Sequence, residues 1–182
     1  MTGPDKIAHA LLDGLRPLAG LPVLDGPGLY IFALGPGARL TGITPAERGL
    51  LYLGMTAQSL SLRNHFLHPD SGRSTLRRSL GALLADPLQL IAVPRGRGAS
   101  ERDIANFRFG NDGEARLTAW MGAQLLACQI ALNDGVRELE KQLIQSMKPP
   151  LNLTDWPNPQ RAIIDSARRK CRERARAALA AR

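Results

Sequence analysis

The sequence predicts an α+β fold from two observations: short apolar runs bounded by glycine and proline, and longer segments with helical periodicity or capping residues. Three runs, 29–34, 50–54 and 125–132, have the length and composition of buried strands. A loop rich in glycine and proline follows the first run, and we pair the first two runs as a hairpin. A further short strand is expected over 88–93.

Two of the predicted helices have clear boundaries. Ser74 is a good N-cap for a helix over 75–85. Asp134 is expected to cap a helix that ends at Met147, because two prolines follow shortly after. The other predicted helices cover 5–18, 59–66, 112–124 and 161–182.

Length and composition limit the class of protein. The chain has 182 residues with 24 basic and 16 acidic side chains and a net charge of +8, which favours a polyanionic partner such as nucleic acid. No apolar run reaches the roughly 18 residues of a membrane span, and the N-terminus lacks the pattern of a secretory signal. Cys128 and Cys171 are too few for a disulfide scaffold or a four-ligand zinc site. We therefore expect a cytoplasmic protein with reduced thiols, no membrane association and no small-molecule cofactor.

Two stretches hold much of the basic charge. Residues 161–182 carry eight basic and two acidic side chains. Small or apolar residues recur there at steps of three and four and form one helical stripe: Ile164, Ala167, Cys171, Ala175 and Ala178. This segment is either a solubilising surface helix docked by its stripe or a contact to phosphate groups. With a second basic stretch over 63–102, it supplies the predicted nucleic-acid-binding residues: Arg73, Arg77, Arg78, Arg168, Arg169 and Arg172.

One carboxylate in the helix after Asp134 falls on an apolar face. At about 100° per residue, the apolar side chains of that helix share one arc: Val136, Leu139, Leu143, Ile144 and Met147. Glu140 lies inside the arc, whereas Glu138 lies on the solvent side. A carboxylate on an apolar face needs a cation, a hydrogen-bond network or a metal as its partner. Glu140 is therefore either half of an ion pair with an arginine, or a metal ligand or acid–base group in a cleft.

Two tyrosines in neighbouring predicted strands favour the second alternative. Tyr30 and Tyr52 each lie beside a glycine, which lets a large group approach the strand backbone. Ordinary core packing with the hydroxyl at the rim is the other explanation for such tyrosines. A carboxylate that holds Mg²⁺, an arginine such as Arg63 and a tyrosine that passes a proton suit phosphodiester hydrolysis. The pKa of that tyrosine, ordinarily near 10, would have to fall.

Four segments, in order, resemble the motifs of the GIY-YIG nuclease family. The tripeptides Gly-Leu-Tyr over 28–30 and Tyr-Leu-Gly over 52–54 are similar to the two that name the family, with leucine in place of isoleucine. Arg63 resembles the arginine of the helix that follows them. The stretch 140–152 resembles the last motif, with a glutamate, then a proline, and an asparagine twelve residues after the glutamate.

This resemblance covers about 28–67 and 126–152 and implies a small three-stranded antiparallel sheet flanked by helices. The chain is then divided into three parts: an N-terminal helical extension over 1–27, a nuclease domain over 28–153 with a helical insertion at about 68–125, and a basic C-terminal helix over 154–182.

The resemblance also implies single-metal hydrolysis of DNA, with Mg²⁺ or Mn²⁺ as the ion. Glu140 would hold the metal and Arg63 would bind the phosphate. Tyr30 would organise the water and phosphate, and Tyr52 would be the general base or would position the water. Structural roles near the site are implied for Gly28, Gly54 and Asn152.

Two departures from the family pattern leave a second function open. Many members have a lysine or another polar residue where this chain has Met55, and often a histidine where it has Leu67. His65 and His68 flank the latter position and are either catalytic substitutes or ordinary surface histidines. The alternative function is a nucleic-acid-binding module that keeps the fold with weak or no catalysis.

Overall fold

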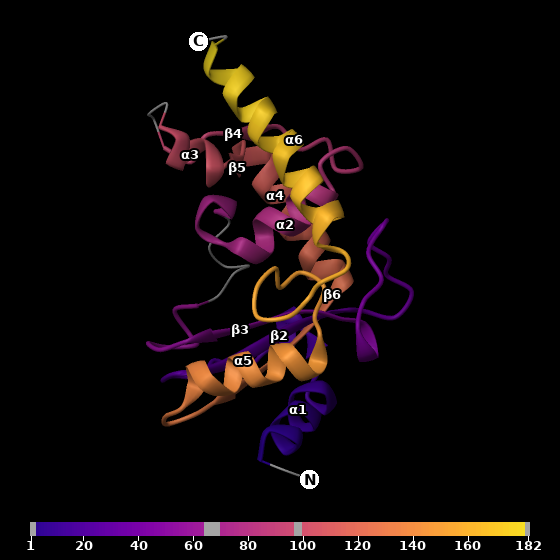
Figure 1. The fold of residues 1–182 in the computed structure, drawn as a ribbon, viewed down its shortest axis with the longest axis vertical. Coiled ribbons are helices and arrows are strands. Elements are labelled where there is room, and N and C mark those ends of the chain that lie inside the picture. The colour runs from indigo at the N-terminus through magenta and orange to yellow at the C-terminus, as the bar shows by residue number, and fades with distance from the viewer. Residues whose placement is uncertain (1–2, 64–69, 97–99, 181–182) are drawn as a thin grey trace. The chain divides into compact units, whose positions relative to one another are not determined.

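The computed structural model describes residues 3–63, 70–96 and 100–180, which form two compact units (Figure 1). The first unit combines residues 1–39, 43–64 and 122–159, and the second combines 40–42, 65–121 and 160–182. Most of the stretch expected as an insertion therefore belongs to the same unit as the basic C-terminal helix.

The first unit is built on a four-stranded antiparallel sheet in the order β1-β6-β2-β3. Its strands are β1 Arg16–Pro17, β2 Gly28–Leu34, β3 Leu50–Thr56 and β6 Leu125–Ala131. The expected hairpin is confirmed, because β2 pairs antiparallel with β3. β6 pairs with the other edge of β2. Every residue of β2 is buried, which explains its continuous apolar sequence.

The expectation of three strands is wrong by one short edge strand. The helix predicted over 5–18 ends early, as α1 Gly3–Asp13, and Arg16 and Pro17 pair with β6 instead. Arg16 precedes a proline, a position that disfavours helical backbone. Pro17 has no N–H to donate, which restricts it to a sheet edge.

α1 and α5 Val136–Met147 lie together against the sheet of the first unit (Figure 1). The core between them contains apolar residues of both helices and of three strands: Leu11, Leu12, Leu29, Ile31, Leu53, Cys128, Val136, Leu143 and Ile144. The segment expected as an extension, 1–27, thus contributes to the core. The prediction that Asp134 caps α5 is wrong. Gly135 is the capping residue, with φ of 63° and no side-chain cap, because glycine adopts the left-handed region freely.

The second unit is mainly helical. It contains α2 Thr75–Leu83, α3 Glu101–Ala105, most of α4 Asn111–Gln124, α6 Arg161–Ala180 and the paired strands β4 Ala92–Val93 and β5 Arg108–Phe109. Ser74 caps α2 as predicted, accepting the Arg77 N–H at 3.2 Å. The strand predicted over 88–93 shrinks to β4, because Leu88 and Gln89 form hydrogen-bonded turns after α2.

α6 docks by the stripe that its sequence predicts, with Ile164, Cys171 and Ala175 buried. Burial raises the pKa of the Cys171 thiol to about 11, so this thiol is protonated at neutral pH. Among the described residues, the first unit also contains the 3₁₀ turns η1 Leu18–Gly20 and η2 Glu47–Gly49, and the second unit contains η3 Ser71–Arg73. Within the described ranges, no helix is both long and apolar enough to cross a membrane.

Candidate active site

The hairpin of β2 and β3 brings Tyr30 and Tyr52 together. Tyr30 lies opposite Gly54, so Tyr52 is its diagonal neighbour on the same face of the sheet. The two ring centroids are 6.3 Å apart. A side chain at position 54 is excluded, since its Cβ would lie 2.6 Å from the Tyr30 hydroxyl oxygen. Gly54 therefore makes room for the Tyr30 ring.

Gly28 makes room for a different neighbour. A Cβ at this position would clash with the Ile130 carbonyl oxygen on the paired strand β6 and would lie 2.7 Å from a methyl carbon of Leu60, which is buried. Leu60 begins the turn that carries Arg63, whose N–H bonds to the carbonyl oxygens of Ser59 and Leu60 at 3.2 and 3.1 Å. The helix predicted over 59–66 is this single turn as far as the described residues extend. Gly28 thus allows both β6 and the Arg63 turn to pack close to β2.

Hydrogen bonds link the arginine and the two phenols. The exposed Arg63 guanidinium and the Tyr52 hydroxyl both donate to the Tyr30 oxygen. Tyr30 is only 2% exposed, and burial raises the pKa of both phenols above 10, while Arg63 acts in the opposite direction. Both tyrosines are therefore neutral at neutral pH in the protein alone.

Glu140 lies on α5, close enough to raise the pKa of both phenols. Its side chain is half-buried and accepts a hydrogen bond from the Met55 backbone N–H. Burial and the nearby Asp155 raise the pKa of Glu140, and Arg137 and Arg63 oppose them from a distance. Within the described part of the chain Glu140 makes no ion pair. The arginine partner considered for this carboxylate is therefore not found there, and Glu138 is exposed.

Asn152 ties the segment after α5 to the middle of β3. Its side chain accepts the Leu53 N–H at 3.0 Å and donates to the Leu53 carbonyl oxygen at 2.8 Å. Leu53 lies between Tyr52 and Gly54, so Asn152 imitates a neighbouring strand at this point of the sheet. The buried amide thereby fixes the end of the Glu140 helix against the strand that carries Tyr52.

Asp155 is a neighbour of Glu140 that the sequence analysis did not identify. Its loop folds back on Asn152, whose carbonyl oxygen accepts from Trp156 Nε1 at 3.0 Å and Asn158 Nδ2 at 2.9 Å. Asp155 has φ of 71°, a left-handed backbone that aspartate tolerates better than most residues. The sequence signal was weak, because the loop has no periodicity against which a misplaced carboxylate stands out.

One predicted nucleic-acid-binding residue is wrongly assigned. Arg77 is fully buried and pairs with Glu114 at 2.7 Å, so it is not available to nucleic acid. Arg73 and Arg169 are exposed, and Arg78, Arg168 and Arg172 are partly exposed. His65, Leu67 and His68 lie outside the described residues.

Among the described residues, no three histidine, cysteine or acidic side chains gather as a metal-binding group.

Comparison with protein families gives a match to the GIY-YIG catalytic domain over residues 39–174. Comparisons with curated proteins and with solved structures give no match. The matched span contains Tyr52, Arg63, Glu140 and Asn152, and it begins after Tyr30. It covers well over half of the chain. The chain therefore belongs to the GIY-YIG catalytic domain family, which implies a nuclease-type function on nucleic acid and, in general, the use of a divalent metal ion.

Proposed function

We propose that this protein is a Mg²⁺-dependent DNA endonuclease that hydrolyses phosphodiester bonds with a single metal ion. One observation carries the proposal: Arg63 and Tyr52 both bond to the Tyr30 hydroxyl, beside a half-buried Glu140 that lacks an ion-pair partner in the described structure. These groups belong to the segments that resemble the family motifs, and all of them lie in one unit of the fold.

Each group has a chemistry suited to the reaction. Arg63 is an exposed residue, and its guanidinium can neutralise charge that develops on the phosphate oxygens. Tyr30, fixed by Arg63 and Tyr52, would orient the water and phosphate. Tyr52 would position the attacking water or accept its proton.

The residues around Glu140 fit a hard divalent cation. A carboxylate oxygen is the ligand type that Mg²⁺ prefers, and Mg²⁺ commonly keeps several waters when one or two carboxylates bind it. Asp155 adds negative charge nearby. Bound there, a divalent cation would stabilise the leaving oxygen. A positive charge near Tyr52 would also lower the pKa of that phenol, in the direction needed for a base.

The experiment is a comparison of Glu140→Gln with Glu138→Gln. The first substitution keeps the size of the side chain but removes the charge that holds a hard cation. The second removes the same charge from the exposed side of α5. Plasmid nicking is measured with Mg²⁺ and with chelator, and Mn²⁺ binding is measured by electron paramagnetic resonance without DNA.

We expect Glu140→Gln to abolish nicking and weaken Mn²⁺ binding while retaining DNA binding. Glu138→Gln should match the wild-type protein in all three measurements. Nicking by Glu140→Gln at the wild-type rate would rule out the proposed mechanism.

A DNA-binding module with weak or absent catalysis is the second candidate. It is favoured by the raised pKa of Tyr52 and by Met55, which leaves no side-chain proton acceptor just after Gly54. Under this alternative, wild-type protein binds DNA but nicks no plasmid with either Mg²⁺ or Mn²⁺.

A further inference from the structure

The second unit contains a cavity of about 600 Å³ whose lining is rich in arginine. Three arginines line it, Arg73, Arg78 and Arg95, together with Asp70 and Asn106. We propose that this cavity, the arginine pocket, binds phosphate groups of a nucleic-acid backbone. The pocket shares no residue with the proposed catalytic site, and the inference rests on the proposed function only in taking DNA as the polymer.

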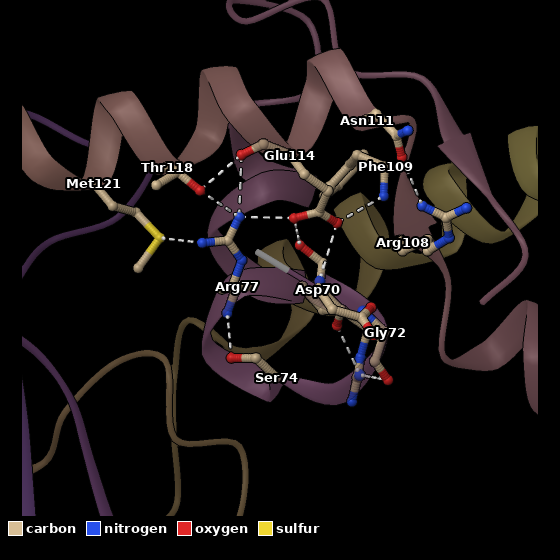
Figure 2. Close-up of polar contacts among 12 residues, drawn as sticks. Asp70, Gly72, Ser74, Arg77, Arg108, Phe109, Asn111, Glu114, Thr118 and Met121 are labelled. Carbon is tan, nitrogen blue, oxygen red and sulfur yellow. Dashed lines mark hydrogen bonds and ion pairs between the residues drawn. The ribbon is translucent and has the colours of Figure 1, made fainter. Parts of the chain in front are cut away.

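A buried carboxylate holds one wall of the pocket in place (Figure 2). Glu114, on α4, accepts the Ser71 N–H and hydroxyl, each at 3.0 Å, and the Phe109 N–H at 3.0 Å. It also pairs with Arg77 at 2.7 Å. Ser71 begins η3, the turn that carries Gly72 and Arg73. The wall is therefore anchored to the interior of the unit and does not depend on a ligand for its shape.

Arg78 is fixed in orientation but keeps its charge. Its Nη1 donates to the carbonyl oxygens of Ser71 at 3.0 Å and Gly72 at 2.9 Å. Carbonyl groups accept hydrogen bonds without cancelling a positive charge. Arg78 is partly exposed, and an arginine held in this way loses little entropy when it binds an anion.

Arg95 lies over the same turn because position 72 is glycine. A Cβ there would lie 2.6 Å from Cγ of Arg95. Arg95 reaches Asp103 at 3.6 Å, but Asp103 also accepts the Ser100 hydroxyl at 2.7 Å. This long pair leaves Arg95 able to contact another anion.

Arg73 is the most accessible of the three. Its side chain is 84% exposed and lies 3.4 Å from Asp70. An exposed pair at such a distance contributes little to stability, so an entering phosphate oxygen can replace Asp70 at small cost. The three arginines thus combine one fixed cation with two that can exchange partners.

The lining also indicates which part of a nucleic acid the pocket would contact. No aromatic residue is among the described residues that line it, so this described lining offers bases no surface on which to stack. Arginine forks match phosphate oxygens in geometry and charge. Contacts of this kind position a protein on the backbone without reading sequence.

The test is DNA binding without metal, measured by fluorescence anisotropy over a range of salt concentrations in chelator. Arg73→Ala is the main variant because the side chain is exposed and should not affect folding. We expect affinity to fall roughly tenfold and the log–log salt slope to fall by about 0.9. Adding Arg95→Ala should lower the slope by about as much again, and Arg73→Lys should restore the slope.

Arg161→Ala is the matched control, since Arg161 is an exposed, ion-paired arginine of the same unit outside the pocket. If Arg73→Ala and Arg161→Ala change the slope equally, net charge is the cause and the proposal is wrong. Calorimetric titration with sodium phosphate separates the sources of phosphate. Loss of phosphate binding in Arg73→Ala with an unchanged DNA slope would indicate a small-molecule site and overturn the proposal.

Because the measurement needs no cleavage, it separates this inference from the nuclease proposal. A wild-type protein that nicks plasmid, with Arg73→Ala binding DNA normally, refutes only the pocket. A wild-type protein that nicks nothing, with a reduced slope for Arg73→Ala, supports the pocket and refutes only the catalytic proposal.

Discussion

Two glutamates on helices, Glu140 and Glu114, have opposite surroundings. Glu114 is 3% exposed, pairs with Arg77 and accepts three further hydrogen bonds from Ser71 and Phe109. Glu140 is half-buried and accepts one backbone N–H. Burial and the negative charge of Asp155 raise its pKa. The four donors around Glu114 compensate for its burial, whereas the surroundings of Glu140 disfavour its charge.

This difference separates a carboxylate that stabilises the fold from one that is suited to a ligand. A buried charge whose hydrogen bonds are complete holds its neighbours in place and gains little free energy from binding a further cation. A carboxylate with a raised pKa and few donors gains most when a cation arrives. The same substitution should therefore lower the stability of the fold at Glu114 and leave it nearly unchanged at Glu140.

The largest expected effect on stability is that of Glu114→Gln. Removing this charge leaves the Arg77 guanidinium buried without its partner, which costs about 3–5 kcal/mol. Chemical denaturation should show this loss, and Glu140→Gln should unfold close to the wild-type midpoint. Equal stability of the two variants would contradict the distinction between the carboxylates.

A smaller effect, on catalysis alone, is expected for Arg63→Ala. The exposed guanidinium contributes charge at the phosphate and one hydrogen bond to Tyr30, so its removal should slow nicking by about 10²-fold or more. The melting temperature should stay near the wild-type value. Arg48→Ala is the control, since Arg48 is another exposed arginine of the first unit, paired with Asp13 at 2.6 Å.

Most of the first unit could be predicted from its sequence because its signals are local. The strands 29–34, 50–54 and 125–132 lie within β2, β3 and β6 or extend them by one residue. Glu140 was identified from its angle on α5. Glu114 was missed, although the same arithmetic places it about 60° from Leu117 on α4, and Leu117 is buried.

Arg77 shows where sequence patterns fail. A basic stretch indicates charge but not which of its side chains point inward, and the partner of Arg77 is 37 residues away. The left-handed cap at Gly135 and the edge strand at Pro17 were missed for a related reason. The local sequence allows the backbone geometry of the cap and of the edge strand, but it does not determine either of them.

The pH dependence of Mn²⁺ binding should also distinguish Glu140 from an ordinary carboxyl group. Because the folded-state pKa of Glu140 is raised, this group favours folding when protonated, and that contribution disappears as pH rises through the raised pKa. Metal binding needs the carboxylate, so Mn²⁺ binding should decline with falling pH sooner than it would at an ordinary carboxyl group. Paramagnetic resonance at a series of pH values measures this decline, and Asp155→Asn should move it to lower pH. A midpoint that Asp155→Asn leaves unchanged would exclude Asp155 as a cause.

The smallest expected effect concerns α6. Some of its arginines are paired within the protein, and others are available to a ligand. Arg174 and Arg176 already pair with Asp86 and Glu101, each at 2.9 Å, whereas Arg169 is exposed and has no ion pair within the described ranges. Deleting the helix would not test DNA binding alone, because Ile164, Cys171 and Ala175 of its stripe are buried in the second unit. Arg169→Ala should lower the salt slope of DNA binding by at most about 0.9, the value for one phosphate contact. Arg176→Ala removes the same charge from a pair and should change the slope less. A larger effect of Arg176→Ala would mean that pairing within the protein does not decide which cations contact DNA.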